Sequence, residues 1–270
     1  MKTDKVIDGV LIKATQPKTG EPYVWPKGVT EIGEYAFSNW TSFNQSFSIP
    51  KSVTRIGDCA FYRWQSFNQK FSIPKSVTKI GEYAFSNWNS FNQPFSIPDG
   101  VTEIGACAFY CWNSFNQPFS IPEGMTKIGA CAFSNWHSFN QPFSIPEGVT
   151  KIGEWAFYGW NSFNQPFSIP KSATEIGGYA FYNWTAFNHP FSIPESVTKI
   201  GEYAFSWWNS FNQPNSRKAV ATNAWLRIDN WVFAGCYSGT LEQLRERLDS
   251  GESTPEREKA WKRISKPFPC

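Results

Sequence analysis

Hydrophobic and polar positions recur along this chain with a period of 24 residues. One copy of the pattern runs from Phe95 to Pro118, and the next begins at Phe119 with the same order of residue types. A fixed period of this size is typical of a solenoid, in which each repeat buries its apolar face only against its neighbours. We therefore expect one elongated domain. The most regular column of the pattern is a tryptophan, found at Trp40, Trp64, Trp88, Trp112, Trp136, Trp160, Trp184 and Trp208.

Within one repeat the pattern predicts a short strand followed by a tight turn. Phe47-Ser48-Ile49 alternates apolar, polar and apolar residues and ends at Pro50, which favours a strand with Ser48 facing outward. Stacked copies would then form a parallel sheet with a row of exposed serines. Residues 58–64 are too few for a long helix, and we expect a helical or 3₁₀ turn there. The predicted fold class is therefore an α+β repeat solenoid with a parallel sheet on one face.

Two regular columns could be mistaken for binding rows. The high aromatic content of 18%, with 25 Phe and 14 Trp, falls mostly in periodic positions. Large rings repeated in this way are expected to pack against their own copies in the core. The asparagine column is expected to satisfy backbone groups of the neighbouring turns, because an unpaired buried backbone group costs about 1–3 kcal/mol. Its members are Asn44, Asn68, Asn92, Asn116, Asn140, Asn164, Asn188 and Asn212.

The repeated string Ile-Pro-x-x-Val-Thr-x-Ile-Gly-x-x-Ala-Phe, seen at residues 73–85, resembles the BspA-like class of leucine-rich repeats. The match covers about residues 24–214. The resemblance implies a leucine-rich-repeat-like superhelix, here with 24-residue turns, and roles in surface adhesion or protein binding. This chain departs from the family pattern in three ways. Trp64 and its equivalents stand where the family usually has Cys, Phe67 and its equivalents replace Leu, and an extra residue such as Pro94 lengthens the repeat.

Both ends of the chain predict caps around the solenoid of residues 23–214. Residues 1–22 contain two apolar segments around Asp8-Gly9, which favours a hairpin over the first turn. In the segment 215–270, residues 228–236 resemble a degenerate ninth repeat that lacks the regular spacing. Capping signals then predict helices at about 240–248 and 254–264. Such a cap would prevent the exposed edge of the stack from polymerising.

Net charge and the composition of individual segments argue against several classes of function. The net charge is only +3, with 25 basic against 22 acidic residues, which does not indicate binding to nucleic acid. The N-terminus lacks the apolar run of a secretory signal, and no stretch approaches 18 apolar residues, so membrane insertion is not expected. We expect the chain in the cytoplasm, exported without a cleavable leader, or trimmed of its signal. Its six cysteines do not form a small disulfide framework, and reduced thiols are expected.

Residues with catalytic or metal-binding chemistry are scarce. His137 and His189 lie in variable surface columns, and no nucleophile motif or phosphate-binding loop accompanies them. We expect no enzymatic activity and no cofactor. Cys107, Cys111 and Cys131 form one closer group, which could hold zinc if a fourth ligand came from elsewhere. The alternative is that each cysteine replaces Tyr or Trp in a half-buried column, and the absence of a C-x-x-C pair favours it.

Specificity is expected where otherwise similar repeats differ. The candidate partner-binding residues occupy two adjacent variable columns, and exposed Tyr, Trp and Arg often anchor interfaces, although neutral variation is an alternative. The leading hypothesis is a non-enzymatic protein-interaction solenoid that uses either the serine-lined or the tyrosine-bearing face. The alternatives are an adhesive or carbohydrate-binding module, and a secreted effector whose segment 215–270 acts on a target. The candidates are Tyr62, Tyr110, Tyr158 and Tyr182 in one column, and Arg63 and Trp207 in the next.

Overall fold

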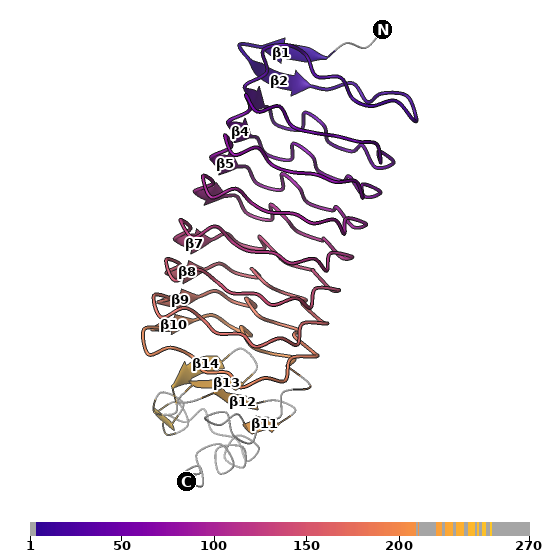
Figure 1. The fold of residues 1–270 in the computed structure, drawn as a ribbon. Coiled ribbons are helices and arrows are strands. Elements are labelled where there is room, and N and C mark those ends of the chain that lie inside the picture. Colours follow the sequence, from indigo (N-terminus) through magenta and orange to yellow (C-terminus); the bar gives the residue numbers. More distant parts are fainter. Residues whose placement is uncertain are drawn as a thin grey trace.

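The chain folds into one stack of 24-residue turns (Figure 1). The computed structural model describes residues 4–208, 210, 220–222, 225–228, 231–234, 237–240, 242, 245, 246 and 249. Each repeat contributes the same apolar side chains to the interior, and the buried residues from Leu11 to Trp208 form a single hydrophobic cluster. The repeats therefore share one continuous core, as the 24-residue period predicts.

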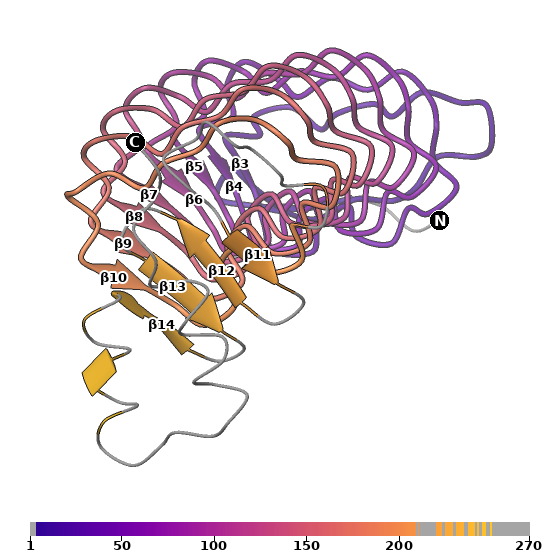
Figure 2. The same cartoon turned by 90° about the horizontal axis from the view of Figure 1, so that it is seen from below.

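Each repeat contributes one two-residue strand to a parallel ladder. In-register pairing places isoleucine beside isoleucine, as in Ile32 with Ile56, and each of these side chains points into the core. Figure 2 shows these strands following one edge of the stack. The strands are β3 (Glu31–Ile32), β4 (Arg55–Ile56), β5 (Lys79–Ile80), β6 (Glu103–Ile104), β7 (Lys127–Ile128), β8 (Lys151–Ile152), β9 (Glu175–Ile176) and β10 (Lys199–Ile200).

The position of this ladder corrects the sequence-based expectation of a sheet at Phe47-Ser48-Ile49. That segment has the predicted alternation, with Phe47 and Ile49 buried and Ser48 exposed, but it is not part of a strand. The parallel rings of the Phe47 column lie 6.1–6.5 Å apart in consecutive repeats. This separation exceeds the ~4.8 Å of hydrogen-bonded strands. Prolines on both sides, such as Pro94 and Pro98, also remove donors that a ladder would need.

The expected helical turn at residues 58–64 is absent, so the predicted α+β class overstates the helix content of the described solenoid. Residues 58–63 instead form consecutive turns, and Cys59 (φ 52°) and Arg63 (φ 64°) adopt left-handed backbone conformations. A helix cannot continue through such residues. The described solenoid is therefore built from β-ladder and turns.

The N-terminal end is covered by a hairpin of β1 (Lys5–Ile7) and β2 (Val10–Lys13). Asp8 and Gly9 between them both have positive φ angles, as a tight hairpin turn requires. Strand β2 then pairs in parallel with β3, so the hairpin extends the ladder. The hairpin thus occupies the edge that β3 would otherwise expose.

Beyond the last regular turn, the chain changes to antiparallel pairing. Strands β11 (Val220–Thr222), β12 (Trp225–Ile228), β13 (Trp231–Ala234) and β14 (Tyr237–Thr240) form a four-stranded sheet in that order. Figure 1 shows this sheet at the C-terminal end of the stack. Of the segment expected to form a ninth repeat, Ile228 ends β12 and residues 231–234 form β13, and the rest lies outside the described residues. Most of the expected helix at 240–248, and all of that at 254–264, lie outside the described residues.

The tryptophan column forms the centre of the core, as expected. Rings from consecutive repeats stack with centroids 5.5–5.8 Å apart and planes within 11° of each other. Each indole N–H from Trp64 onward donates to a phenylalanine carbonyl of the preceding repeat, as Trp112 Nε1 does to Phe85 O at 2.7 Å. Burial of the indole therefore leaves no unsatisfied donor.

Candidate recognition surface

The variable columns lie on what we call the turn face, which consists of residues 58–63 and their equivalents in the other repeats. Backbone N–H groups of this segment donate alternately within a repeat and to the next repeat. Phe61 N donates to Ala84 O at 2.8 Å, whereas Tyr62 N donates to Cys59 O at 3.1 Å. These hydrogen bonds, made both within a repeat and to the next one, fix the backbone from which the variable side chains project.

The six candidate residues all lie on the turn face, but they do not form one cluster. Tyr62 and Arg63 lie side by side near the N-terminal end, with the guanidinium carbon 5.2 Å from the ring centroid. Tyr158 and Tyr182 stack at 5.3 Å, and Tyr182 lies 6.2 Å from Trp207. Ser134 takes the place of an aromatic residue between Tyr110 and Tyr158 in this column, and it separates Tyr110 from the C-terminal group.

Three further aromatic residues complete that C-terminal group, and sequence reasoning did not select them. Trp155 and Tyr179 stack at 4.1 Å, and Tyr179 and Tyr203 stack at 4.9 Å. The column of Trp155 joins that of Tyr158, with ring centroids 5.0 Å apart. The sequence did contain a signal, since this column holds Tyr, Trp or Cys in every repeat. We call the joined group the aromatic ladder, comprising Trp155, Tyr158, Tyr179, Tyr182, Tyr203 and Trp207.

The aromatic ladder is partly open to solvent. The Trp207 side chain is 59% exposed, and the other members are half-buried. Burial and the neighbouring phenols Tyr158 and Tyr179 raise the pKa of Tyr182. The Tyr182 hydroxyl therefore keeps its proton at neutral pH and can both donate and accept hydrogen bonds. Where rings stack, as Trp155 does on Tyr179 and Tyr158 on Tyr182, they cover part of each other's faces.

The cysteines on the turn face do not assemble as a zinc site. Cys107 and Cys131 occupy one column in consecutive repeats, whereas Cys111 lies in another column and accepts a hydrogen bond from Asn135 Nδ2 at 3.5 Å. No group of three or more His, Cys, Asp or Glu side chains suited to a metal ion is found in the described part of the chain. Cys59, Cys107, Cys111 and Cys131 are free thiols. Cys107 and Cys131 stand in the column that holds Tyr35 and Tyr83 in other repeats, and Cys111 stands in the column of Asn135.

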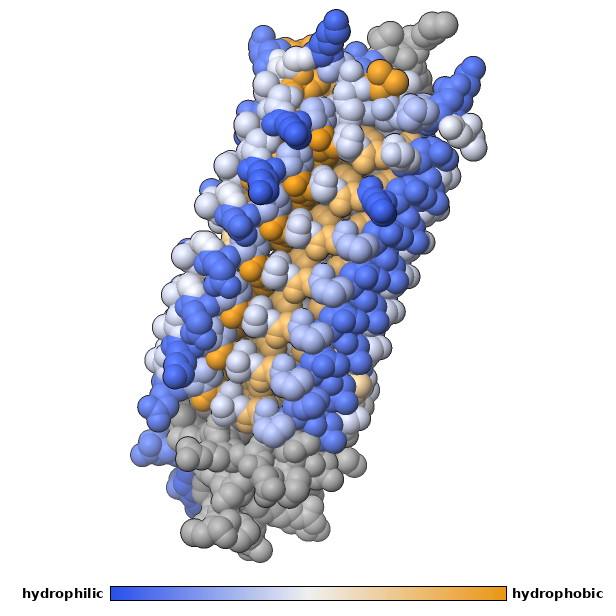
Figure 3. All heavy atoms as spheres, in the orientation of Figure 1, coloured by the Kyte–Doolittle hydropathy of each residue, from blue (hydrophilic) through white to orange (hydrophobic). Residues whose placement is uncertain are grey.

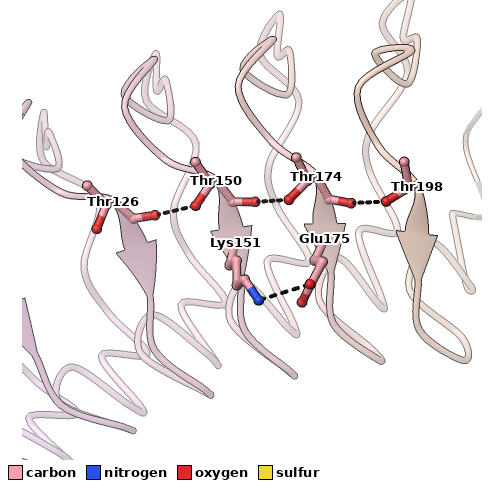
Figure 4. Close-up of polar contacts among 6 residues, drawn as sticks. All are labelled: Thr126, Thr150, Lys151, Thr174, Glu175 and Thr198. Carbon is pink, nitrogen blue, oxygen red and sulfur yellow. Dashed lines mark hydrogen bonds and ion pairs between the residues drawn. The ribbon is translucent and has the colours of Figure 1, made fainter.

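Other regular columns hold the stack together. Asn68 N donates to Asn44 Oδ1 at 2.9 Å, and the same bond recurs in the following repeats. This confirms the structural role expected for asparagine. A second ladder runs along the threonines, where Thr174 Oγ1 donates to Thr150 O at 3.2 Å (Figure 4). Beside it, Lys151 Nζ lies 2.9 Å from Glu175 Oε1, an exposed ion pair that lowers the pKa of Glu175.

An apolar stripe runs along one face of the stack between rows of hydrophilic residues (Figure 3). Phe47 and Ile49 and their equivalents up to Ile193 retain between 3% and 7% exposure. Ser48 and its equivalents are exposed. The serine-lined face therefore offers little apolar area per residue. The turn face exposes far larger parts of its rings, including 54% of Tyr35 and 40% of Tyr83.

Comparison with known families agrees with this architecture. A family model described as "BspA type Leucine rich repeat region" matches residues 21–140 and 108–240, with six copies. No curated protein sequence matches the chain. Within the described residues, no helix is long and apolar enough to cross a lipid bilayer.

The chain is similar to several solved bacterial structures. A leucine-rich repeat protein from Bacteroides ovatus matches with a TM-score of 0.59 and 28% identity, over 66% of this chain and 44% of that chain. The T. pallidum leucine-rich repeat protein matches with a TM-score of 0.56 and 21% identity, over 74% and 92% of the two chains. A leucine-rich cell surface protein from Faecalibacterium prausnitzii matches with a TM-score of 0.44 and 24% identity, over 69% and 55%. The chain thus spans less than half the length of the Bacteroides ovatus protein.

Proposed function

Because the chain belongs to the BspA-type leucine-rich repeat family, we propose that it is a non-enzymatic recognition module that binds a protein partner through its aromatic ladder. The leucine-rich repeat solenoid is typical of protein-interaction modules. The observation that supports this surface is the continuous contact of six aromatic side chains across three consecutive repeats. Tyrosine and tryptophan are the residues most often found at the energetic centre of protein interfaces.

The ladder has two properties that favour binding. Its side chains are already ordered by stacking, so a partner would restrict little additional rotamer freedom on contact. The outward ring edges and phenol groups suit apolar side chains and backbone carbonyls of a protein. Binding to the flat face of a sugar would need an open ring face, and the pairs Trp155–Tyr179 and Tyr158–Tyr182 stack face to face, which leaves Trp207 as the member with an exposed ring. A protein partner is therefore favoured over a glycan.

The test compares the proteins captured by the wild type with those captured by two triple variants, one on each face. The turn-face variant combines Tyr158→Ser, Tyr182→Ser and Trp207→Asn. Serine and asparagine occupy these same columns in other repeats, for example at Ser134 and Asn135, so the solenoid should retain its fold. The control variant combines Ser48→Ala, Ser120→Ala and Ser192→Ala on the serine-lined face.

Each protein is immobilised and exposed to cell-surface extracts, and the captured proteins are quantified by mass spectrometry. We expect the wild type and the control variant to capture the same proteins, and the turn-face variant to lose at least about ten-fold of that signal. Loss of one interface hot spot costs about 2 kcal/mol or more, which corresponds to a change of this size. Equal capture by all three proteins would exclude the aromatic ladder as the binding surface.

A further inference from the structure

Cys107 and Cys131 occupy the same turn position in consecutive repeats. Both residues have left-handed backbones, with φ angles of 56° and 54°, so their side chains project in the same direction. Cys107 N donates to the carbonyl of Ala130, the residue before Cys131, at 2.8 Å. Two positions further on, Phe109 and Phe133 are parallel within 2° and 5.6 Å apart. The two repeats are therefore held in register at the cysteines.

Side chains in this column touch their copies in the next repeat. Trp155 and Tyr179, in the same column, stack at 4.1 Å. Cys131 and Tyr83 are accordingly the neighbouring groups that lower the pKa of Cys107, to about 7, against the opposing effect of burial. A thiolate at this position is the form that reacts with oxidants.

The same repeat junction lacks the strand pairing found at the others. The sheet that begins at β1 ends at β6, and a separate sheet begins at β7. At the neighbouring junction, Gly153 N donates to Ile128 O at 2.9 Å, whereas no corresponding bond joins Gly129 to Ile104 among the described residues. A covalent link at Cys107 and Cys131 would therefore join two repeats across the weakest part of the ladder.

We propose that Cys107 and Cys131 are a modification site at which hydrogen peroxide forms an intramolecular disulfide. The Cys107 thiolate attacks one peroxide oxygen, the O–O bond breaks, and the released hydroxide takes a proton to become water. Cys107 is then a sulfenic acid. The Cys131 sulfur attacks the Cys107 sulfur, the S–O bond breaks, and hydroxide leaves and combines with the Cys131 proton to form a second water. In total, two thiols are oxidised to one disulfide and one peroxide is reduced to two waters.

The linkage can be identified by peptide mapping, because trypsin cleaves after Lys79, Lys127 and Lys151. Cys107 and Cys111 then lie in peptide 80–127, and Cys131 lies in peptide 128–151. Reduced protein is treated with a small excess of hydrogen peroxide, alkylated, digested without reductant and analysed by mass spectrometry. We expect peptides 80–127 and 128–151 to appear joined and to separate after reduction.

Two substitutions replace a cysteine with the residue that other repeats have in the same column. Cys111→Asn should retain the joined peptides, because asparagine fills that column in four other repeats and the proposed partner is Cys107. Cys131→Tyr should abolish them and leave Cys107 to oxidise to sulfinic acid, since the proposed resolving thiol of Cys131 is removed. Oxidation should also raise the melting temperature of the wild type by roughly 5 °C, because the disulfide closes a loop between repeats. The Cys131→Tyr protein should show no such rise.

Three results would overturn the proposal. The first is over-oxidation of Cys107 in the folded wild type without joined peptides. The second is loss of the joined peptides in Cys111→Asn, which would assign the linkage to Cys111. The third is an equal yield of joined peptides in urea-unfolded and folded protein, because the proposal depends on the folded repeats holding the two sulfurs together.

Discussion

At two positions of each repeat on the turn face, the backbone conformation limits which residue types can occur. In each repeat, two positions four residues apart have φ angles of about +52° to +75°, a region open mainly to Gly, Asn and a few other residues. This explains why Asn recurs in the column of Cys111 and why no β-branched residue is found there. The variation on the turn face is thus limited to side chains that tolerate this conformation.

This restriction predicts different effects for two substitutions of Cys111. Cys111→Val should lower the free energy of unfolding by about 1–2 kcal/mol, because a β-branched side chain at φ 61° clashes with its own backbone. Cys111→Asn should change it by less than about 0.5 kcal/mol. Urea unfolding monitored by tryptophan fluorescence measures both. Equal destabilisation by valine and asparagine would show that loss of the sulfur, and not backbone strain, is responsible.

A single histidine gives the stack a modest sensitivity to acid. Desolvation lowers the pKa of His137 in the folded protein below its ordinary value of 6.5. The unfolded chain therefore binds this proton more readily, so stability falls as the pH drops from about 7 through the ordinary pKa. His137→Asn, which copies Asn113 and Asn161 in the same column, should reduce this fall. Unfolding midpoints at pH 7.5 and 5.5 test the expectation, and an identical pH dependence in both proteins would contradict it.

At the scale of elements, the parallel ladder is interrupted at one junction, between β6 and β7. The core position preceding these strands holds valine or alanine in the other repeats and Met125 in this one. Methionine is longer than valine, and we attribute the separation of the two strands to it. The turn face stays bonded at this junction, where Cys107 N reaches Ala130 O at 2.8 Å. The interruption therefore affects one side of the solenoid only.

Met125→Val should close this interruption. We expect the amide of Gly129 to gain a hydrogen bond to Ile104 O, as Gly153 has to Ile128 O, and to exchange its hydrogen at least about ten-fold more slowly. Hydrogen exchange followed by NMR or mass spectrometry measures this directly. The reverse substitution, Val149→Met, should speed exchange at Gly153 by a comparable factor. Unchanged exchange at Gly129 in Met125→Val would assign the interruption to another cause.

The strands and turns show which parts of the fold could be predicted from the sequence. The 24-residue period identifies the stack, its core columns and the structural asparagines, because each follows from which side chains must be buried or paired. The period does not show which extended segment carries the backbone ladder. Phe47-Ser48-Ile49 has the alternation of a strand, but it is not paired, and the rings of Phe47 and Phe71 lie 6.4 Å apart. The less regular Thr54-Arg55-Ile56 carries the ladder, because the repeats approach closely enough there for hydrogen bonds.

At the scale of the whole molecule, the candidate surface depends on contacts between repeats that no single repeat reveals. The sequence identified Tyr158, Tyr182 and Trp207 because they vary, but it did not show that Trp155 and Tyr179 join them. The column of Trp155 and the column of Tyr158, three residues later, become one surface only when the repeats are stacked. The partner-binding role of these residues stays a prediction, whereas their assembly into one ladder is visible in the structure.

A solenoid of this kind should tolerate loss of a complete repeat better than loss of part of one. Deletion of residues 95–118 joins Pro94 to Phe119, as Pro118 is joined to Phe119 in the native chain, and leaves every column in register. Deletion of residues 95–106 removes β6 and half of the core columns of that repeat, and the following turns can no longer superpose. Because stability is a sum of repeat and neighbour terms, we expect the first variant to fold with a lower unfolding midpoint and the second to lose cooperative unfolding. Circular dichroism and urea titration distinguish the two.

If both variants fold equally well, or both fail to fold, the stack does not behave as a chain of equivalent, interchangeable turns. In that case the interruption at β6 and β7 would mark a boundary between two folding units, and deletions on either side of it would have unequal effects.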